Sequence, residues 1–257
     1  MKNTVQQISI IGSGNVAWHL AVNFINIGVK VSHIAGRNVK HVDLLCKKTA
    51  ATHAKSISDL PKHQLVIICT PDNSIATICE SIDSSCPVAY TSGSIDIESL
   101  PHREHLGVFY PLQTFSKHIE LDLNQVPFFI ESTNEVFTQD LFILASKITD
   151  TVTLANSKER SELHLAAVFV NNFTNHIIHQ AQQYAESKSI DFNHLIPLLK
   201  ETVHKLDLDS AFNTQTGPAR RGDDVIIQKH VERLDNNAKE LYQLLSKSIK
   251  ETYHDQL

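Results

Sequence analysis

Two glycines separated by one residue follow a short apolar run near the start of the chain. Gly12-Ser13-Gly14 comes after residues 8–11, and Ala17 takes the last, small-residue position of a G-x-G-x-x-G/A fingerprint. Gly12 permits a tight turn out of a strand, and Gly14, which lacks a Cβ atom, lets a pyrophosphate approach the backbone. The N-terminus of the following helix would bind the phosphates. This spacing predicts a dinucleotide-binding site that consists of Gly12, Ser13, Gly14, Asn15 and Val16. The alternative is that the glycines serve only the geometry of the turn.

The end of the second predicted strand favours a phosphorylated cofactor. It reads Ala35-Gly36-Arg37-Asn38 and has no Asp or Glu to bind a ribose 2′-hydroxyl, as NAD sites usually do. The Arg37 guanidinium suits a 2′-phosphate, and Asn38 can add a hydrogen bond. We therefore expect NADP rather than NAD as the cofactor. The alternative is a solvated arginine at the surface.

Two further strand ends carry small polar residues. Thr70-Pro71-Asp72 follows one predicted strand, and Thr91-Ser92-Gly93-Ser94 follows the next. Ligands of open α/β sheets lie beyond the carboxyl ends of the strands. Thr70, Pro71, Ser92 and Gly93 are therefore expected to line the cofactor, although the same residue types are common in ordinary turns.

Three polar residues fall on one stripe of a long predicted helix. At 100° per residue, His164, Asn171 and Asn175 lie within about 20° of one line. His164 can donate a proton to a carbonyl that is being reduced, because histidine titrates near neutrality. Asn171 would orient the substrate, and Asn175 would contact it. The alternative is a histidine whose hydrogen bonds are satisfied at a seam between domains.

A rigid turn near the C-terminus presents two adjacent arginines. The segment Thr216-Gly217-Pro218-Ala219-Arg220-Arg221-Gly222-Asp223-Asp224 contains two glycines and a proline. Arg220 and Arg221 can clamp a carboxylate or phosphate of the substrate. The alternative is a helix connection whose arginines pair with Asp223 and Asp224.

The elements that must position these residues change character near residue 155. The first part alternates strands and helices and predicts a doubly wound α/β sheet, with strands near residues 8–11, 29–34, 64–69, 87–91, 106–110, 128–130 and 151–154. Only helices are expected afterwards. The first would run from a capping box of Asn156 and Glu159 to about residue 186. We expect a dinucleotide-binding domain over residues 1–154 and a helical substrate and dimerisation domain over 155–257.

That long helix also bears on assembly. It would span roughly 45 Å, more than the width of a small domain, so part of its apolar face is expected to meet a second subunit in a homodimer.

Composition narrows the class of protein. The 257 residues are 42% hydrophobic and carry a net charge of −5, which argues against nucleic acid as a partner. No segment is apolar enough for a membrane span, and we expect a cytoplasmic protein that binds a small molecule. Four cysteines lack metal spacing, and His176-x-x-His179 has no accompanying ligands, so no metal is expected.

The motifs together resemble a family of two-domain proteins. Its Rossmann-like domain is related to pyrroline-5-carboxylate reductases and deazaflavin-dependent NADP oxidoreductases. Its C-terminal helical domain, of unknown function, is similar to that of 6-phosphogluconate dehydrogenase. The resemblance covers nearly the whole chain and rests on residues 12–17, Ser92-Gly93, 110–115, 164–173 and 216–223. It implies a predicted oxidoreductase of unestablished substrate, and it strengthens the roles of His164 and Asn171.

The chain departs from this pattern at two places. Tyr110 stands where the family has the histidine of His-Pro-Leu-Gln, so Tyr110 or His164 would be the acid. The Lys and Asn pair of 6-phosphogluconate-type dehydrogenases is replaced by Lys158 and Glu162, so a lysine mechanism does not carry over. The sequence thus favours an NADP-dependent reductase or dehydrogenase that acts on a small anionic carbonyl, alcohol or imine. A non-catalytic NADP-binding redox sensor and a protein binding another nucleotide cofactor are the alternatives.

Overall fold

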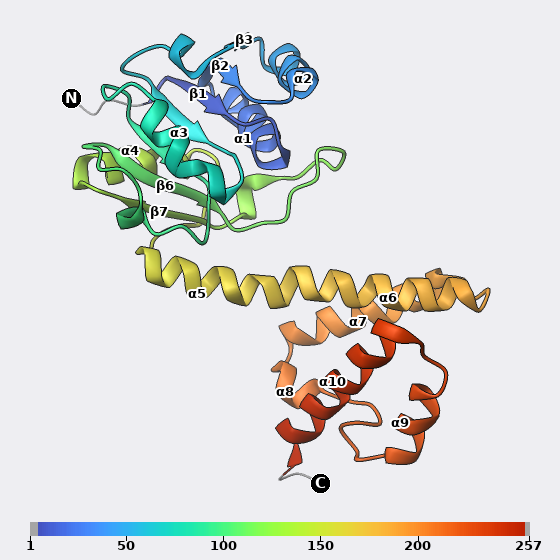
Figure 1. Ribbon diagram of the computed structural model, residues 1–257. Coiled ribbons are helices and arrows are strands. Elements are labelled where there is room, and N and C mark those ends of the chain that lie inside the picture. The colour runs from blue at the N-terminus through green and yellow to red at the C-terminus, as the bar shows by residue number, and fades with distance from the viewer. Residues whose placement is uncertain (1–4, 255–257) are drawn as a thin grey trace. The chain divides into compact units, whose positions relative to one another are not determined.

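An eight-stranded sheet forms the first part of the molecule (Figure 1). The structure, a computed structural model, describes residues 5–254. The strand order is β3-β2-β1-β4-β5-β6-β7-β8, and neighbouring strands are parallel except for the antiparallel pair β6 and β7. The strands are β1 (Gln7–Ile11), β2 (Lys30–Ala35), β3 (Thr52–His53), β4 (Leu65–Ile68), β5 (Val88–Tyr90), β6 (Leu106–Pro111), β7 (Phe128–Ser132) and β8 (Val152–Leu154).

The central strands β4, β5 and β6 are buried on both faces, which explains their apolar runs. Successive side chains of β4 enter opposite faces, so Leu65 and Ile67 join one core cluster and Val66 and Ile68 the other. The first cluster packs against α1 (Asn15–Asn26), α2 (Val39–Thr49) and α4 (Glu135–Ser146), and the second against α3 (Ile75–Ser81).

Polar side chains cap α2 and α4, whereas α1 and α3 have no side-chain cap among the described residues. Asn134 accepts a hydrogen bond from the Phe137 N–H and begins α4, while Ala50 ends α2 in a left-handed conformation. Single turns of 3₁₀ helix occupy the remaining connections at η1 (Ile57–Asp59), η2 (Asp72–Ser74), η3 (Ile97–Ser99) and η4 (Leu123–Gln125).

Helices alone follow the sheet within the described residues 155–254. They are α5 (Ser157–Ala167), α6 (Thr174–Ser187), α7 (Ile196–His204), α8 (Ala211–Thr214), α9 (Asp224–Val231) and α10 (Asn236–Thr252), with 3₁₀ turns at η6 (Phe192–Leu195) and η7 (Lys205–Asp207). The label η5 (Val168–Phe173) is a π-helical segment that joins α5 to α6 without a break. Asn156 and Glu159 form the predicted capping box at the start of α5.

The contacts divide the chain into two units, Met1–Asn172 and Phe173–Leu257. The expected domain boundary at residue 154 marks the end of the last strand, whereas this division falls within η5. Helix α5 therefore belongs to the unit that contains the sheet.

The predicted fold class is confirmed, with one strand added. The two-residue strand β3 escaped the sequence analysis because it is too short to show a period. Among the described residues, none of the helices combines the length and the apolar character needed to cross a membrane.

Candidate cofactor and active site

The turn after β1 has the geometry that its glycines predict. Gly12 has a φ of +129°, and a Cβ atom there would lie 2.4 Å from the Cys69 carbonyl oxygen. Gly14 precedes α1 and has no atom within 4 Å of an added Cβ, so the space in front of the helix is open. No side chain among the described residues caps α1. The open space and the uncapped helix N-terminus fit a pyrophosphate group.

The end of β2 lies beside this turn. A Cβ atom on Gly36 would lie 3.5 Å from Ser13 Oγ, so the two turns are neighbours. Arg37 is exposed at this point. The Asn38 side-chain oxygen accepts a hydrogen bond from the His41 N–H at 3.1 Å and begins α2. Asn38 thus has a capping role that was not predicted, and its two amide N–H groups remain as donors for a phosphate of the ligand.

The connection after β6 crosses the glycine turn. The Asn15 amide donates to the Phe115 carbonyl at 2.8 Å, and His19 Nε2 lies 2.9 Å from the Ser116 carbonyl oxygen. Lys117 Nζ then donates to the Ser13 carbonyl at 2.7 Å. Lys117 was not among the predicted residues, because more than 100 positions separate it from the turn that it contacts.

The next two strand ends are held by local hydrogen bonds. Ser74 Oγ donates to the Thr70 hydroxyl at 2.9 Å and to the Pro71 carbonyl at 2.7 Å. The buried Ser92 hydroxyl accepts hydrogen bonds from the backbone N–H groups of Ser94 and Ile95. These contacts shape the loops, and the predicted role of Thr70, Pro71 and Ser92 toward a cofactor stays a prediction.

Two of the predicted catalytic residues meet beside Gly93. The Tyr110 hydroxyl and His164 Nδ1 are 2.9 Å apart, although 54 positions separate the residues. Their ring centroids are 6.0 Å apart in an edge-on arrangement. A Cβ atom on Gly93 would lie 2.7 Å from both His164 Nδ1 and Tyr110 Cζ, so only glycine fits against this pair. Burial raises the pKa of Tyr110 to about 12, and the phenol keeps its proton at neutral pH.

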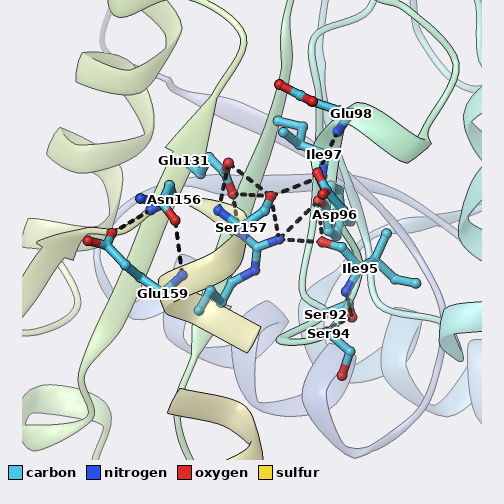
Figure 2. A network of polar contacts seen from close by, with 12 residues as sticks. Ser92, Ser94, Ile95, Asp96, Ile97, Glu98, Glu131, Asn156, Ser157 and Glu159 are labelled. Atoms are coloured by element: carbon cyan, nitrogen blue, oxygen red, sulfur yellow. Dashed lines mark hydrogen bonds and ion pairs between the residues drawn. The ribbon is translucent and has the colours of Figure 1, made fainter. Parts of the chain in front are cut away.

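A buried polar network fixes the helix that carries His164 (Figure 2). Arg160 is fully buried, forms an ion pair with Glu131 and donates to the Ile95 carbonyl. Ser157 donates to Glu131 through its N–H and its hydroxyl, both at 2.9 Å. Arg160 also lies 3.3 Å from the Tyr90 hydroxyl, whose pKa burial raises. Since Arg160 precedes His164 by four residues, the network orients the helix face that meets Tyr110.

Neither Arg160 nor Glu131 was predicted from the sequence. The available signal was the spacing, because a charged residue four positions before His164 must lie on the same helix face.

The stripe of His164, Asn171 and Asn175 requires a correction. Asn171 lies in the π-helical segment and Asn175 follows it, so the 100° step used for the prediction does not hold between them. Both asparagines are exposed. Asn175 belongs to the second unit, and its role toward a substrate stays a prediction.

The arginine turn also lies in the second unit. Gly217 and Gly222 have φ angles of +107° and +67°, which confirms that glycines shape this turn. The Arg220 guanidinium stacks 4.4 Å from the centre of the Tyr253 ring, and Arg221 is exposed. Asp223 caps α9 and Asp224 pairs with Lys250. The proposed grip of Arg220 and Arg221 on a substrate anion stays a prediction.

The described part of the chain contains no cluster of metal ligands and no cysteine that is activated for thiol chemistry. Residues 5–254 hold no group of three or more metal-ligating side chains. All four cysteines are free thiols, and burial raises the pKa of Cys69 to about 12. A thiol that keeps its proton is a poor nucleophile. The arrangement instead combines a nucleotide turn with a protonated phenol and an imidazole.

Comparisons with known proteins agree with this geometry. DUF2520, a domain of unknown function, matches residues 126–249. A protein from Bacteroides fragilis whose name ascribes NADP oxidoreductase activity to it shares 34% identity, with a TM-score of 0.90 over 96% of this chain and 98% of its own. None of the curated proteins compared with the chain is similar to it.

More distant structures share the fold. A Thermotoga maritima protein has 20% identity and a TM-score of 0.68 over 97% of this chain and 99% of its own. An Aspergillus terreus reductive aminase, solved with NADPH and ethyl levulinate, has 13% identity and a TM-score of 0.68 over 98% of this chain and 95% of its own. The Bacteroides fragilis protein is 34% identical to this chain over almost the full length of both proteins. The chain therefore belongs to the family of two-domain, Rossmann-like proteins that carry a DUF2520 domain.

Proposed function

We propose that the protein is an NADP-dependent oxidoreductase that transfers a hydride to or from a small anionic carbonyl, alcohol or imine. The observation that carries this proposal is the Tyr110 and His164 pair, 2.9 Å apart, at the same edge of the sheet as the glycine turn. The Bacteroides fragilis relative supports the cofactor, and NADPH-bound reductive aminases share the fold.

The strand order supports one continuous site along this edge. Gly12 follows β1 and Tyr110 lies near the end of β6, and only β4 and β5 lie between these strands. Three strand spacings correspond to roughly 15 Å, a distance that an extended dinucleotide can cover. The order also reverses direction at β1, which is where nucleotides bind in such sheets. NADP(H), when bound, supplies or accepts the hydride.

The chain's own groups would handle the proton. Tyr110 keeps its proton at neutral pH, and its hydroxyl oxygen would accept a hydrogen bond from the Nδ1–H group of a protonated His164. The imidazolium would deliver its Nε2 proton to the substrate oxygen or nitrogen and become a neutral imidazole. Tyr110 would hold the ring in the orientation that this transfer requires. Asn171 would orient the substrate, and Asn175, Arg220 and Arg221 would bind its anionic group.

We also propose a homodimer. Several large apolar side chains on the helix from α5 to α6 are exposed within one chain: Leu165 is 56%, Val170 75% and Ile177 40% exposed. Within the second unit, α6 and α10 form an apolar groove of about 400 Å³ lined by Ile177, Ala181 and Leu245. A second copy would cover such a surface. The four free thiols support a reducing, cytoplasmic location.

A thermal-shift comparison of NADP, NADPH, NAD and NADH tests which of these cofactors the protein prefers. NADPH should stabilise the protein more than NADH at equal concentration, because ligands that bind the native state raise its stability. Arg37→Ala should reduce this preference. Equal shifts from NADPH and NADH would contradict the role of Arg37.

A turnover assay with small carbonyls and cyclic imines that carry a carboxylate tests the catalytic part. His164→Ala should keep NADPH binding and lower kcat by about a hundredfold or more. His176→Ala, which removes an exposed histidine, is the matched control and should keep kcat. NADPH binding without turnover on any substrate would favour the redox sensor, the non-catalytic alternative.

A further inference from the structure

We infer that Lys117 binds the adenosine 2′-phosphate of NADP(H) and, with Arg37, sets the preference for the phosphorylated cofactor. This inference rests on the proposed function. Lys117 lies on the connection from β6 to η4, about 80 residues beyond the strand end where NADP specificity was predicted. Its ammonium donates a hydrogen bond to the Ser13 carbonyl of the glycine turn.

The contacts of Lys117 place its charge at the ribose end of the turn. Lys117 Nζ is 2.7 Å from the Ser13 carbonyl oxygen and 3.5 Å from His41 Nδ1. Ser13 in turn lies beside Gly36, the residue before Arg37. Lys117 and Arg37 therefore flank the same corner, which is where the 2′-substituent of a nucleotide lies in this fold.

The α2 side of this corner carries cationic side chains and no carboxylate. Residues 36–42 include Arg37, Lys40 and His41 but no acidic side chain. The next acidic residue of α2, Asp43, bonds to His53 at 2.7 Å. Among the described residues, no carboxylate forms an ion pair with Lys117. An ammonium has three N–H donors, and the Ser13 carbonyl and His41 take two at most, so one remains for a phosphate oxygen.

The backbone that carries Lys117 is held in place. Phe115 and Ser116 offer their carbonyl oxygens to Asn15 and His19, both on α1. The rings of His19 and Phe115 also contact each other, with centroids 5.4 Å apart. The side chain of Lys117 is half-buried. A cation that is already positioned loses little conformational entropy when the ligand arrives, so it contributes more to affinity.

Isothermal titration of wild type and Lys117→Gln with NADPH and NADH tests this assignment. A charge-assisted hydrogen bond to the 2′-phosphate predicts that Lys117→Gln weakens NADPH binding about tenfold or more. NADH lacks this phosphate, so its Kd should change by less than about twofold. Lys117→Arg keeps the charge and should restore most of the NADPH affinity.

Lys30→Gln is the matched control. It removes the same charge from the opposite end of β2 and should change neither Kd. If Lys117→Gln weakens NADPH and NADH equally, the lysine serves the pyrophosphate or the turn, and the assignment to the 2′-phosphate is overturned. No change for either nucleotide overturns it as well. Failure of wild type to bind either nucleotide would refute the proposed function itself.

A second measurement uses the unmodified protein, so that it does not depend on how the variants fold. Lysine acetylation followed by mass spectrometry should show that NADPH protects Lys117 several-fold more than NADH does, while Lys30 reacts equally with both. Equal reactivity of Lys117 under NADPH and NADH would contradict the inference.

Discussion

At the scale of single residues, Gly93 is tightly packed, whereas Gly14 faces open space. Substitutions at these two glycines therefore distinguish a packing role from a ligand-binding role. A Cβ atom on Gly93 would meet His164 and Tyr110 at 2.7 Å, whereas one on Gly14 would meet nothing within 4 Å. Gly93→Ala must displace a ring, so we expect a loss of about 1–3 kcal/mol in the free energy of unfolding. Denaturant unfolding measures this loss, and turnover should fall with it.

Gly14→Ala is the matched control for Gly93→Ala. The protein should keep its stability in the absence of nucleotide, since the added methyl group points into open space. NADPH should bind this variant more weakly, because the methyl group occupies the position where the pyrophosphate approaches the backbone. Wild-type stability of Gly93→Ala would contradict the close packing of Tyr110 and His164 on this glycine.

At the scale of elements, the ion pair of Arg160 and Glu131 holds α5 to the sheet. Arg160 is fully buried and the Glu131 side chain is 15% exposed, so losing one partner leaves a charge in a poorly hydrated place. Arg160→Met and Glu131→Gln should each destabilise the protein by about 3–5 kcal/mol. The double variant should be more stable than the sum of these losses predicts. Denaturant unfolding of all four proteins measures the coupling.

Glu159→Gln is a control on the same helix turn, because Glu159 is exposed and its carboxylate accepts a hydrogen bond from the Asn156 N–H of the capping box. It should cost no more than a helix cap, about 1 kcal/mol. Strictly additive losses for Arg160→Met and Glu131→Gln would show that the two residues do not act as a pair.

The elements also show which structural features can be predicted from the sequence and which cannot. The glycine turn, the strand before it and the helix after it were predicted because their signals are local and periodic. The contact between Tyr110 and His164 was not, since it depends on how α5 docks on the sheet. Arg160 escaped notice because charged residues are rarely buried. The π-helical segment escaped it because the residues 168–173 continue an ordinary helical pattern.

Assembly is decided at the scale of the whole molecule. Val170 is 75% exposed and lies on the long helix whose apolar face is predicted to meet a second copy. Val170→Asp should leave the single chain folded, because the side chain has few contacts within it. The charge would be desolvated in a dimer interface, so light scattering at micromolar concentration should show a shift from dimer toward monomer.

Val136 provides the control for this experiment. It is 71% exposed on α4, which covers the sheet and is not part of the predicted interface. Val136→Asp adds the same charge at a similar exposure, so the protein should keep its mass and its circular dichroism. If wild type is a monomer at micromolar concentration, the dimer is excluded. If wild type and Val170→Asp are both dimers, the interface lies elsewhere. A buried aspartate without a partner in the interface would cost more free energy than most single contacts contribute.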